Sequence, residues 1–176
     1  MKRGPRGFSL IELLIVVAII LIIAAIAIPN LLRSRIAANQ ASAVGSLRTL
    51  NTAEVTYATT YNTGFSSTLG DLGPPSAGVS LPNATAAGLV DEVLSGMNGS
   101  GGTAGSGATV SAKSGYTFTY SQAGTDVSGK IDVYSIIATP IAVGTTGTNY
   151  YYTDQSGVIR QNSTTVAGST DSPLAG

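Results

Sequence analysis

A carboxylate at the start of a long apolar run poses the clearest chemical question in this sequence. Glu12 precedes residues 13–28, and every one of those side chains is apolar. The nearest preceding cation, Arg6, lies six residues back and on a different helical face. Because a lone charge in hydrocarbon is costly, such residues usually face a partner or serve a function. Glu12 therefore needs a cation that its own helix does not place beside it.

Cleavage of the chain between Gly7 and Phe8 would supply that cation. The new α-amine at Phe8 would stand four residues before Glu12, and this spacing is one helical turn. The cut would also remove three basic residues, leaving six basic and nine acidic residues and a net charge of −3. An amine at Phe8 would then neutralise Glu12, either in its own chain or on a neighbouring one.

The elements that position these groups are a short basic leader and an apolar helix. Residues 1–7 carry three cations, and residues 8–28 contain only two polar side chains. As a helix, residues 8–28 would be about 32 Å long, close to the ~30 Å hydrocarbon core of a bilayer. An ordinary secretory signal has a shorter apolar region. The positive charges before the run predict a single span with a cytoplasmic N-terminus.

The stretch Gly7-Phe8-Ser9-Leu10-Ile11-Glu12, followed by the apolar run, resembles the processing signal of type IV pilins and pseudopilins, in a type IVa-like (class III) form. In that family a membrane peptidase cuts after the glycine and methylates the new N-terminal residue. The resemblance implies that the cut follows Gly7 and that Phe8 is methylated. It also implies that Glu12 sets register between adjacent subunits, by pairing with an N-terminal amine. Pro29 falls where many bacterial pilins have a helix-bending proline.

The function implied by this resemblance is structural, not enzymatic. A prepilin of this kind enters a type IV pilus-like surface filament, a homopolymer held together by the N-terminal helices. The implied partners are a prepilin peptidase/N-methyltransferase, assembly machinery in the bacterial inner membrane, and membrane lipid before assembly. Filaments that serve twitching motility, cell adhesion or DNA uptake have the same kind of N-terminal helix, so the helix does not distinguish these roles. Two alternatives stay open: a pseudopilin of a type II secretion or DNA-uptake system, and a membrane-anchored binding domain that never polymerises.

Beyond the apolar half (residues 8–29) the pattern becomes that of an amphipathic helix over residues 30–62. Apolar residues recur at three- and four-residue spacings, with polar side chains between them. The core-facing positions predicted by these spacings are Leu32, Ile36, Val44, Leu47, Leu50, Val55 and Ala58. Pro29 removes one helical hydrogen bond, so we expect a bend or local melting there. The two halves together predict one bent helix of roughly 50 residues.

Residues 63–161 predict a globular α+β head. We expect a loop over 64–83, a short helix over Ala84–Ser95 and a flexible glycine-rich loop over 96–107. Alternating or β-branched segments predict four antiparallel strands, at Tyr116–Ser121, Lys130–Thr139, Asn149–Asp154 and Val158–Gln161. The amphipathic half of the helix would pack on this sheet. Residues 162–176 are expected to form a polar, mobile tail.

Composition excludes several kinds of chemistry. The 176 residues include no His and no Cys, which excludes imidazole catalysis, thiol catalysis and His/Cys metal sites. The formal net charge is zero, so direct nucleic-acid binding is not expected. The glycine-rich loop ends without the lysine of a phosphate-binding loop. We therefore expect no catalytic residue, no cofactor and no metal site.

Three minor features suggest further possibilities. Asp126 and Asp132 flank a turn, and their oxygens suit Ca²⁺. Tyr150–Tyr152 could belong to an electron path, but no aromatic residue lies between Phe8 and Tyr57, and strand packing explains the tyrosines better. The N-glycosylation pattern occurs at Asn83, Asn98 and Asn162.

Overall fold

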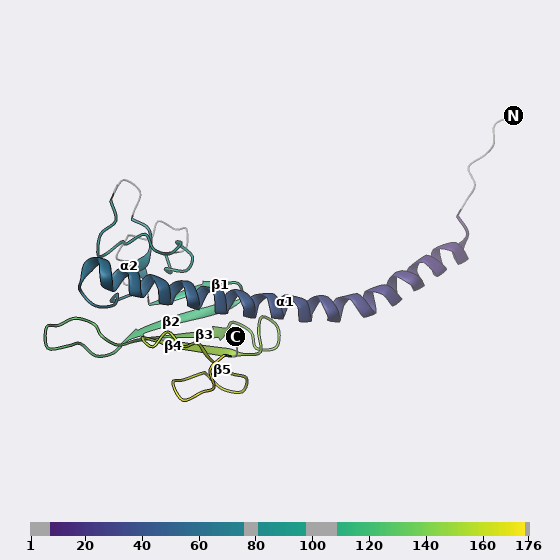
Figure 1. Cartoon of the computed structure of the whole chain (residues 1–176). Coiled ribbons are helices and arrows are strands. Elements are labelled where there is room, and N and C mark those ends of the chain that lie inside the picture. Colours follow the sequence, from purple (N-terminus) through teal and green to yellow (C-terminus); the bar gives the residue numbers. More distant parts are fainter. Residues whose placement is uncertain (1–7, 76–80, 98–108, 175–176) are drawn as a thin grey trace. The chain divides into compact units, whose positions relative to one another are not determined.

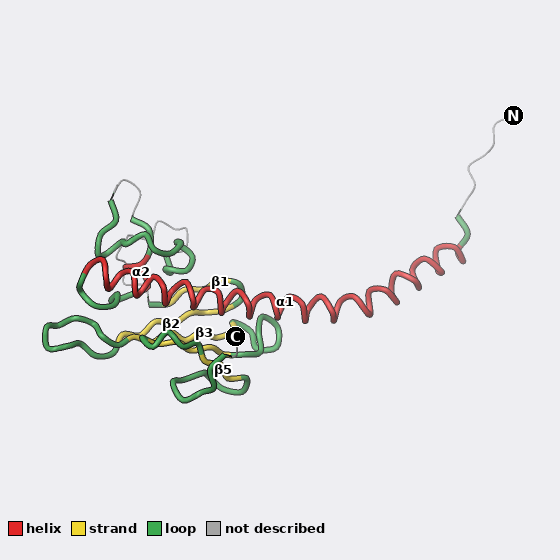
Figure 2. Tube along the Cα trace, viewed as in Figure 1, coloured by secondary structure: helices red, strands yellow, loops and turns green. Residues whose placement is uncertain are grey.

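The structure of the chain is a computed structural model that describes residues 8–75, 81–97 and 109–174. The expected leader, with Gly7, and most of the glycine-rich loop lie outside the described residues. The chain divides into two compact units, one ending at Arg35 and the other beginning at Ile36. Figure 2 shows helix in both units, and strands only in the second. The predicted α+β class is therefore confirmed.

Helix α1 runs from Leu10 to Tyr61 and contributes to both units. It is continuous through Pro29, so the chain does not leave the helical conformation there, and the bend stays a prediction. The helix ends one residue before the expected position. Asn62 and Gly64 both have positive φ, at 54° and 84°. A Cβ on Gly64 would collide with the backbone of Ile131, which forms an isolated bridge with Gly64.

The second unit is built on a five-stranded antiparallel sheet beside the C-terminal part of α1 (Figure 1). The strands are β1 (Val110–Lys113), β2 (Tyr116–Gln122), β3 (Tyr134–Pro140), β4 (Tyr150–Asp154) and β5 (Arg160–Asn162). They pair in sequence order as an up-and-down meander. Strands β2 to β5 match the four predicted strands within a few residues. β1 was missed, because it is short and follows the glycine-rich loop.

The core of the head lies between one face of α1 and one face of the sheet. Alternate residues of β3 are buried along its whole length, as the period of a half-buried strand requires. The helix contributes Ala43, Val44, Leu47, Leu50, Ala53, Glu54 and Tyr57. Val44, Leu47 and Leu50 were predicted correctly. The expectations for Leu32 and Val55 were wrong, because these side chains are 42% and 57% exposed, and Glu54, next to Val55, is fully buried instead.

Two segments between the helix and the sheet differ from expectation. The predicted loop contains a four-residue helix, α2 (Leu69–Leu72), which is closed at its start by a capping box between Thr68 and Asp71. The helix predicted over Ala84–Ser95 was wrong. Gly88 has a φ of 67°, and the N–H groups of residues 87–90 donate to carbonyls of residues 71–73, in and just after α2. These tertiary bonds replace the hydrogen bonds of a helix.

The C-terminal segment also differs from the mobile tail that we expected. Residues 163–174 turn back along the outer edge of β5. Gln161 donates its N–H to the carbonyl of Ser172, and Leu174 donates to that of Ile159, at 3.0 and 2.8 Å. Ala167 is buried at 3% exposure. Hydrogen bonds made by the backbone and by Asp171 thus give this polar segment a defined path.

Candidate functional site

The first turn of α1 contains the expected assembly residue and an internal partner for it. The Glu12 carboxylate accepts a hydrogen bond from the backbone N–H of Ser9, at 2.9 Å. Ser9 immediately precedes the helix, so this bond satisfies one of the N–H groups that the turn leaves free. A carboxylate near a helix N-terminus also interacts favourably with the helix dipole. Glu12 therefore caps its own helix.

The hydrogen bond between Ser9 and Glu12 was missed from the sequence, although a signal for it exists. Ser9-Leu10-Ile11-Glu12 has the spacing of a capping box before an apolar run. The bond to Ser9 leaves most of the hydrogen-bonding capacity of the Glu12 carboxylate free, because a carboxylate has about four acceptor positions. An ammonium group on a neighbouring chain can still pair with it.

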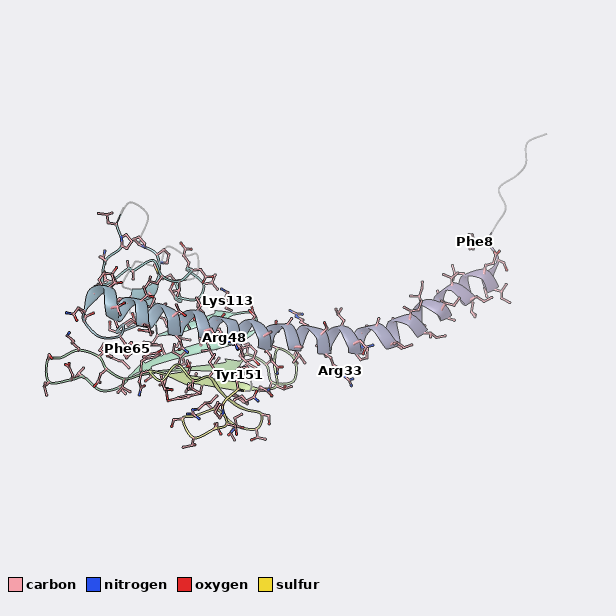
Figure 3. All side chains as sticks on the ribbon, viewed as in Figure 1. Phe8, Arg33, Arg48, Phe65, Lys113 and Tyr151 are labelled. Atoms are coloured by element: carbon pink, nitrogen blue, oxygen red, sulfur yellow. The ribbon has the colours of Figure 1, made fainter. Side chains whose placement is uncertain are left out.

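The structure places Phe8 and Glu12 at the same end of α1, whereas Gly7 lies outside the described residues. Phe8 is 82% exposed and is labelled at the start of the ribbon in Figure 3. The cleavage position, the methylation of Phe8 and the pairing of Glu12 with an amine therefore stay predictions.

The large side chains of the apolar half (residues 8–29) are exposed. From Phe8 to Ile28 their exposed fractions are between 45% and 82%. The helix is long and apolar enough to cross a membrane, and none of its most apolar window is buried. Arg33 and Arg35 lie shortly after the apolar half and are exposed. A surface of this size needs lipid or other apolar helices to cover it.

The second unit holds a buried carboxylate that sequence reasoning also missed. Glu54 accepts hydrogen bonds from the N–H and the hydroxyl of Ser66. Burial raises the pKa of Glu54 to about 7, although the bonds from Ser66 lower it. The nearby Tyr120 hydroxyl donates to the carbonyl of Ser66, and the charge of Asp71 raises the pKa of Glu54 further. This arrangement fixes the segment between α1 and α2.

The acidic residues of the head do not gather into a metal site in the part of the chain that the structure describes. No group of three or more acidic side chains is placed there to hold a metal ion. The carboxylate of Asp126 accepts hydrogen bonds from the N–H groups of Ser128 and Lys130 at 2.7 and 2.9 Å. Asp126 thus closes the turn that we considered for Ca²⁺.

Aromatic contacts in the described residues lie in the head, beyond the apolar run. Tyr151 is buried against Tyr116, with ring centroids 5.9 Å apart, while its neighbours in the Tyr150–Tyr152 run are partly exposed. The other pairs are Tyr57–Tyr61, Phe65–Tyr134 and Tyr120–Tyr134. All four pairs involve side chains that pack in or against the core of the head.

Comparison with known proteins agrees with the geometry at the start of α1. Residues 2–28 match the family model described as the prokaryotic N-terminal methylation motif. The resemblance to type IV pilins recognised in residues 7–12 is thereby confirmed for this segment. No solved structure matches the chain.

Two curated proteins are similar to part of this chain. The type IV major pilin protein PilA of Myxococcus xanthus is 52% identical over 52 residues, which are 30% of this chain and 24% of that protein. The type IV wide pilus major component PilA4 of Thermus thermophilus is 65% identical over 37 residues, which are 21% of this chain and 28% of that protein. The similarity thus spans about a quarter of the length of these relatives.

Proposed function

We propose that this chain is the precursor of a structural subunit of a type IV pilus-like surface filament. One observation carries the proposal: a continuous helix begins within a methylation motif and displays an exposed apolar surface. Before assembly, bilayer lipid covers that surface. In the filament, the same surfaces of neighbouring helices bury one another. The similarity to two major pilins favours this function over a pseudopilin or a simple anchor.

Processing precedes assembly in this proposal. A prepilin peptidase cuts after Gly7 and methylates the amine of Phe8, and the subunit stays in the inner membrane as a single-pass protein with its head exported. Assembly machinery then transfers it to an extracellular filament. As each subunit docks, Glu12 pairs with the Phe8 amine of an adjacent subunit and fixes the register. The carboxylate can do so while it caps its own helix.

Intact mass with N-terminal fragmentation tests the proposal, on protein sheared from cells and on protein kept in membranes. We expect the sheared chain to start at methylated Phe8. A chain that keeps residues 1–7 and occurs only in membranes would support the anchored-domain alternative instead. A short polymer that stays within the envelope would support the pseudopilin.

Substitutions at the cut then test the individual residues. Gly7→Val should block cleavage, because a branched side chain replaces the smallest residue at the cut. Phe8→Ala should still be cleaved. A Gly7→Val protein that is processed normally would contradict the assignment of the cleavage position.

A further inference from the structure

A shallow groove of about 330 Å³ lies on the solvent-facing side of α1 in the head. It is lined by Arg48, Thr49, Thr52, Ala53, Thr56 and Leu89. The three threonine hydroxyls donate to the carbonyls four residues back, those of Gly45, Arg48 and Thr52. Because these hydroxyls are satisfied within the helix, the methyl groups are left to line the groove. The groove is therefore suited to an aliphatic side chain.

A cation stands at the rim of this groove. Arg48 is exposed, and Figure 3 shows it on the part of α1 that belongs to the head. Among the described residues the one ion pair is Lys113–Asp91, so Arg48 is not neutralised by a carboxylate in that part of its own chain. The groove thus combines an apolar floor with a positive rim, which suits an aliphatic side chain next to a carboxylate.

The connection between β2 and β3 presents such a pair of side chains. Val127 is fully exposed at its tip, and Asp126 precedes it. The tip is pre-organised: Asp126 donates its N–H to the carbonyl of Lys130, and Gly129 donates to that of Asp126, at 2.8 and 3.0 Å. The Lys130 ammonium donates to the side chain of Asn62. Rigid loops lose little entropy on binding, which favours association.

The groove and the tip lie at different positions along the axis of α1. The tip is anchored at Asn62, ten residues after Thr52 in the middle of the groove, which corresponds to about 15 Å along the helix axis. This anchoring holds the tip away from the groove of its own chain. A second copy shifted along the axis by about this distance would bring its tip level with the groove, and a rotation about the axis would bring the two surfaces face to face. Contacts between two different surfaces of identical subunits generate open helical polymers.

We propose that the tip of one copy, Asp126–Val127, docks in the groove of a neighbouring copy. Val127 packs against the threonine methyl groups, and the Asp126 carboxylate lies beside Arg48. This contact rests on the polymerisation proposed above and adds to it a second interface, made by the heads. Opposite charges at the rim fix the partner's orientation, while the buried valine supplies apolar contact.

Disulfide trapping tests the contact, and the chain contains no native cysteine to interfere. The full-length chain carries Thr52→Cys and Val127→Cys together, and sheared filaments are oxidised. A disulfide needs Cβ atoms about 3.5–4.5 Å apart. We expect a ladder of covalent oligomers that collapses on reduction, with the 52–127 linkage found by mass spectrometry. After oxidation and denaturation, each single variant should give only monomers, with no covalent oligomers.

A matched control uses an exposed valine on another loop. Val143 is 61% exposed, and a Thr52→Cys/Val143→Cys chain should give no ladder. Filaments of the Thr52→Cys/Val127→Cys chain that yield no 52–127 linkage would overturn the docking and leave the filament function standing. If the unsubstituted chain forms no filament, the proposed function fails and the docking with it.

A second comparison decides the matter if the double-cysteine chain does not assemble. Val127→Lys should lower the yield of sheared filaments by about fivefold or more, because it places a second cation beside Arg48 and against the methyl groups of the groove. Val143→Lys adds the same charge elsewhere and should leave the yield unchanged. Equal yields from these two variants would overturn the docking.

Discussion

The buried carboxylate of Glu54 accepts hydrogen bonds from both the backbone N–H and the hydroxyl of Ser66, at 2.9 and 2.6 Å. One side chain of α1 thereby holds the segment that follows the helix. Burying a carboxylate is unfavourable unless hydrogen bonds compensate, and Ser66 supplies two of them. The pair links the helix to the rest of the head at a point where apolar packing alone would leave the N–H of Ser66 unsatisfied.

Removing the Glu54 side chain should destabilise the head. Glu54→Ala leaves two buried donors of Ser66 without an acceptor, at a cost of about 1–3 kcal/mol each. We expect the free energy of unfolding at pH 5 to fall by about 2–4 kcal/mol. Urea unfolding of the full chain in mild detergent, followed by tyrosine fluorescence, measures this loss. Val55→Ala, at an exposed neighbour, is the control and should change little.

The stability of the head should also fall as pH rises through the titration of Glu54. Its pKa is raised from 4.5 to about 7 in the folded chain, so the folded state holds this proton more tightly than the unfolded state. The stabilisation of the folded state by protonated Glu54 is fully present below about pH 4.5 and is lost as the pH rises to about 7. The change across this interval is on the order of 3 kcal/mol.

The contribution of Glu54 is isolated by the difference between two chains. Other carboxyl groups, such as that of Asp91, have a lowered pKa and favour the folded state at higher pH. Glu54→Gln removes one titration and leaves the others. The wild type should therefore lose stability relative to Glu54→Gln as the pH rises from 4.5 to about 7. Parallel curves for the two proteins would contradict the raised pKa.

Glu12→Gln separates two roles of the first turn of α1. The amide oxygen of Gln can still accept the N–H of Ser9, so the helix should keep its cap. The charge that would pair with an ammonium is lost. If register depends on this charge, Glu12→Gln should reduce filament yield as strongly as Glu12→Ala, while membrane insertion stays intact. Yields near normal for Gln and low for Ala would assign the effect to capping instead.

A side chain at Gly64 should be more destabilising than one at Gly157, although both glycines have a positive φ. Gly64 and Gly157 both have positive φ, but a Cβ at Gly64 meets the backbone of Ile131, whereas a Cβ at Gly157 meets nothing within 4 Å. Gly157→Ala should cost about 1–2 kcal/mol from its left-handed conformation alone. Gly64→Ala should cost clearly more, because the bridge to Ile131 must also open. Urea unfolding of both variants checks the ranking.

Elements set by local periodicity could be predicted from this sequence. The long helix was placed within a few residues, because its apolar run and its three- and four-residue spacings are strong signals. Four strands were found from their alternating or β-branched residues. The helix predicted at Ala84–Ser95 was wrong for a tertiary reason. The N–H groups of residues 87–90 donate to carbonyls of residues 71–73, and such long-range pairing cannot be predicted from the spacing of apolar residues.

The candidate site could be predicted only in part, because some of its contacts join residues that are distant in the sequence. Glu12 was identified because a charged residue beside an apolar run is rare. Its hydrogen bond to the N–H of Ser9 was missed, although the spacing of a capping box is present.

Glu54 stands between Ala53 and Val55, and the spacing of apolar residues pointed to Val55 as the buried position. The burial of Glu54 depends on Ser66 and Tyr120, which come from segments distant in sequence. Pairings of that kind appear only once the chain is folded.

The return of the C-terminal segment along β5 has a consequence for aggregation. An open outer strand offers a row of unpaired N–H and carbonyl groups, which can template pairing with strands of other molecules. Here residues 172–174 occupy that row, and Pro173, opposite Arg160, has no N–H with which to continue the ladder. This edge is therefore closed to the addition of further strands. In the filament proposed above, it would protect crowded subunits from a competing, amyloid-like association.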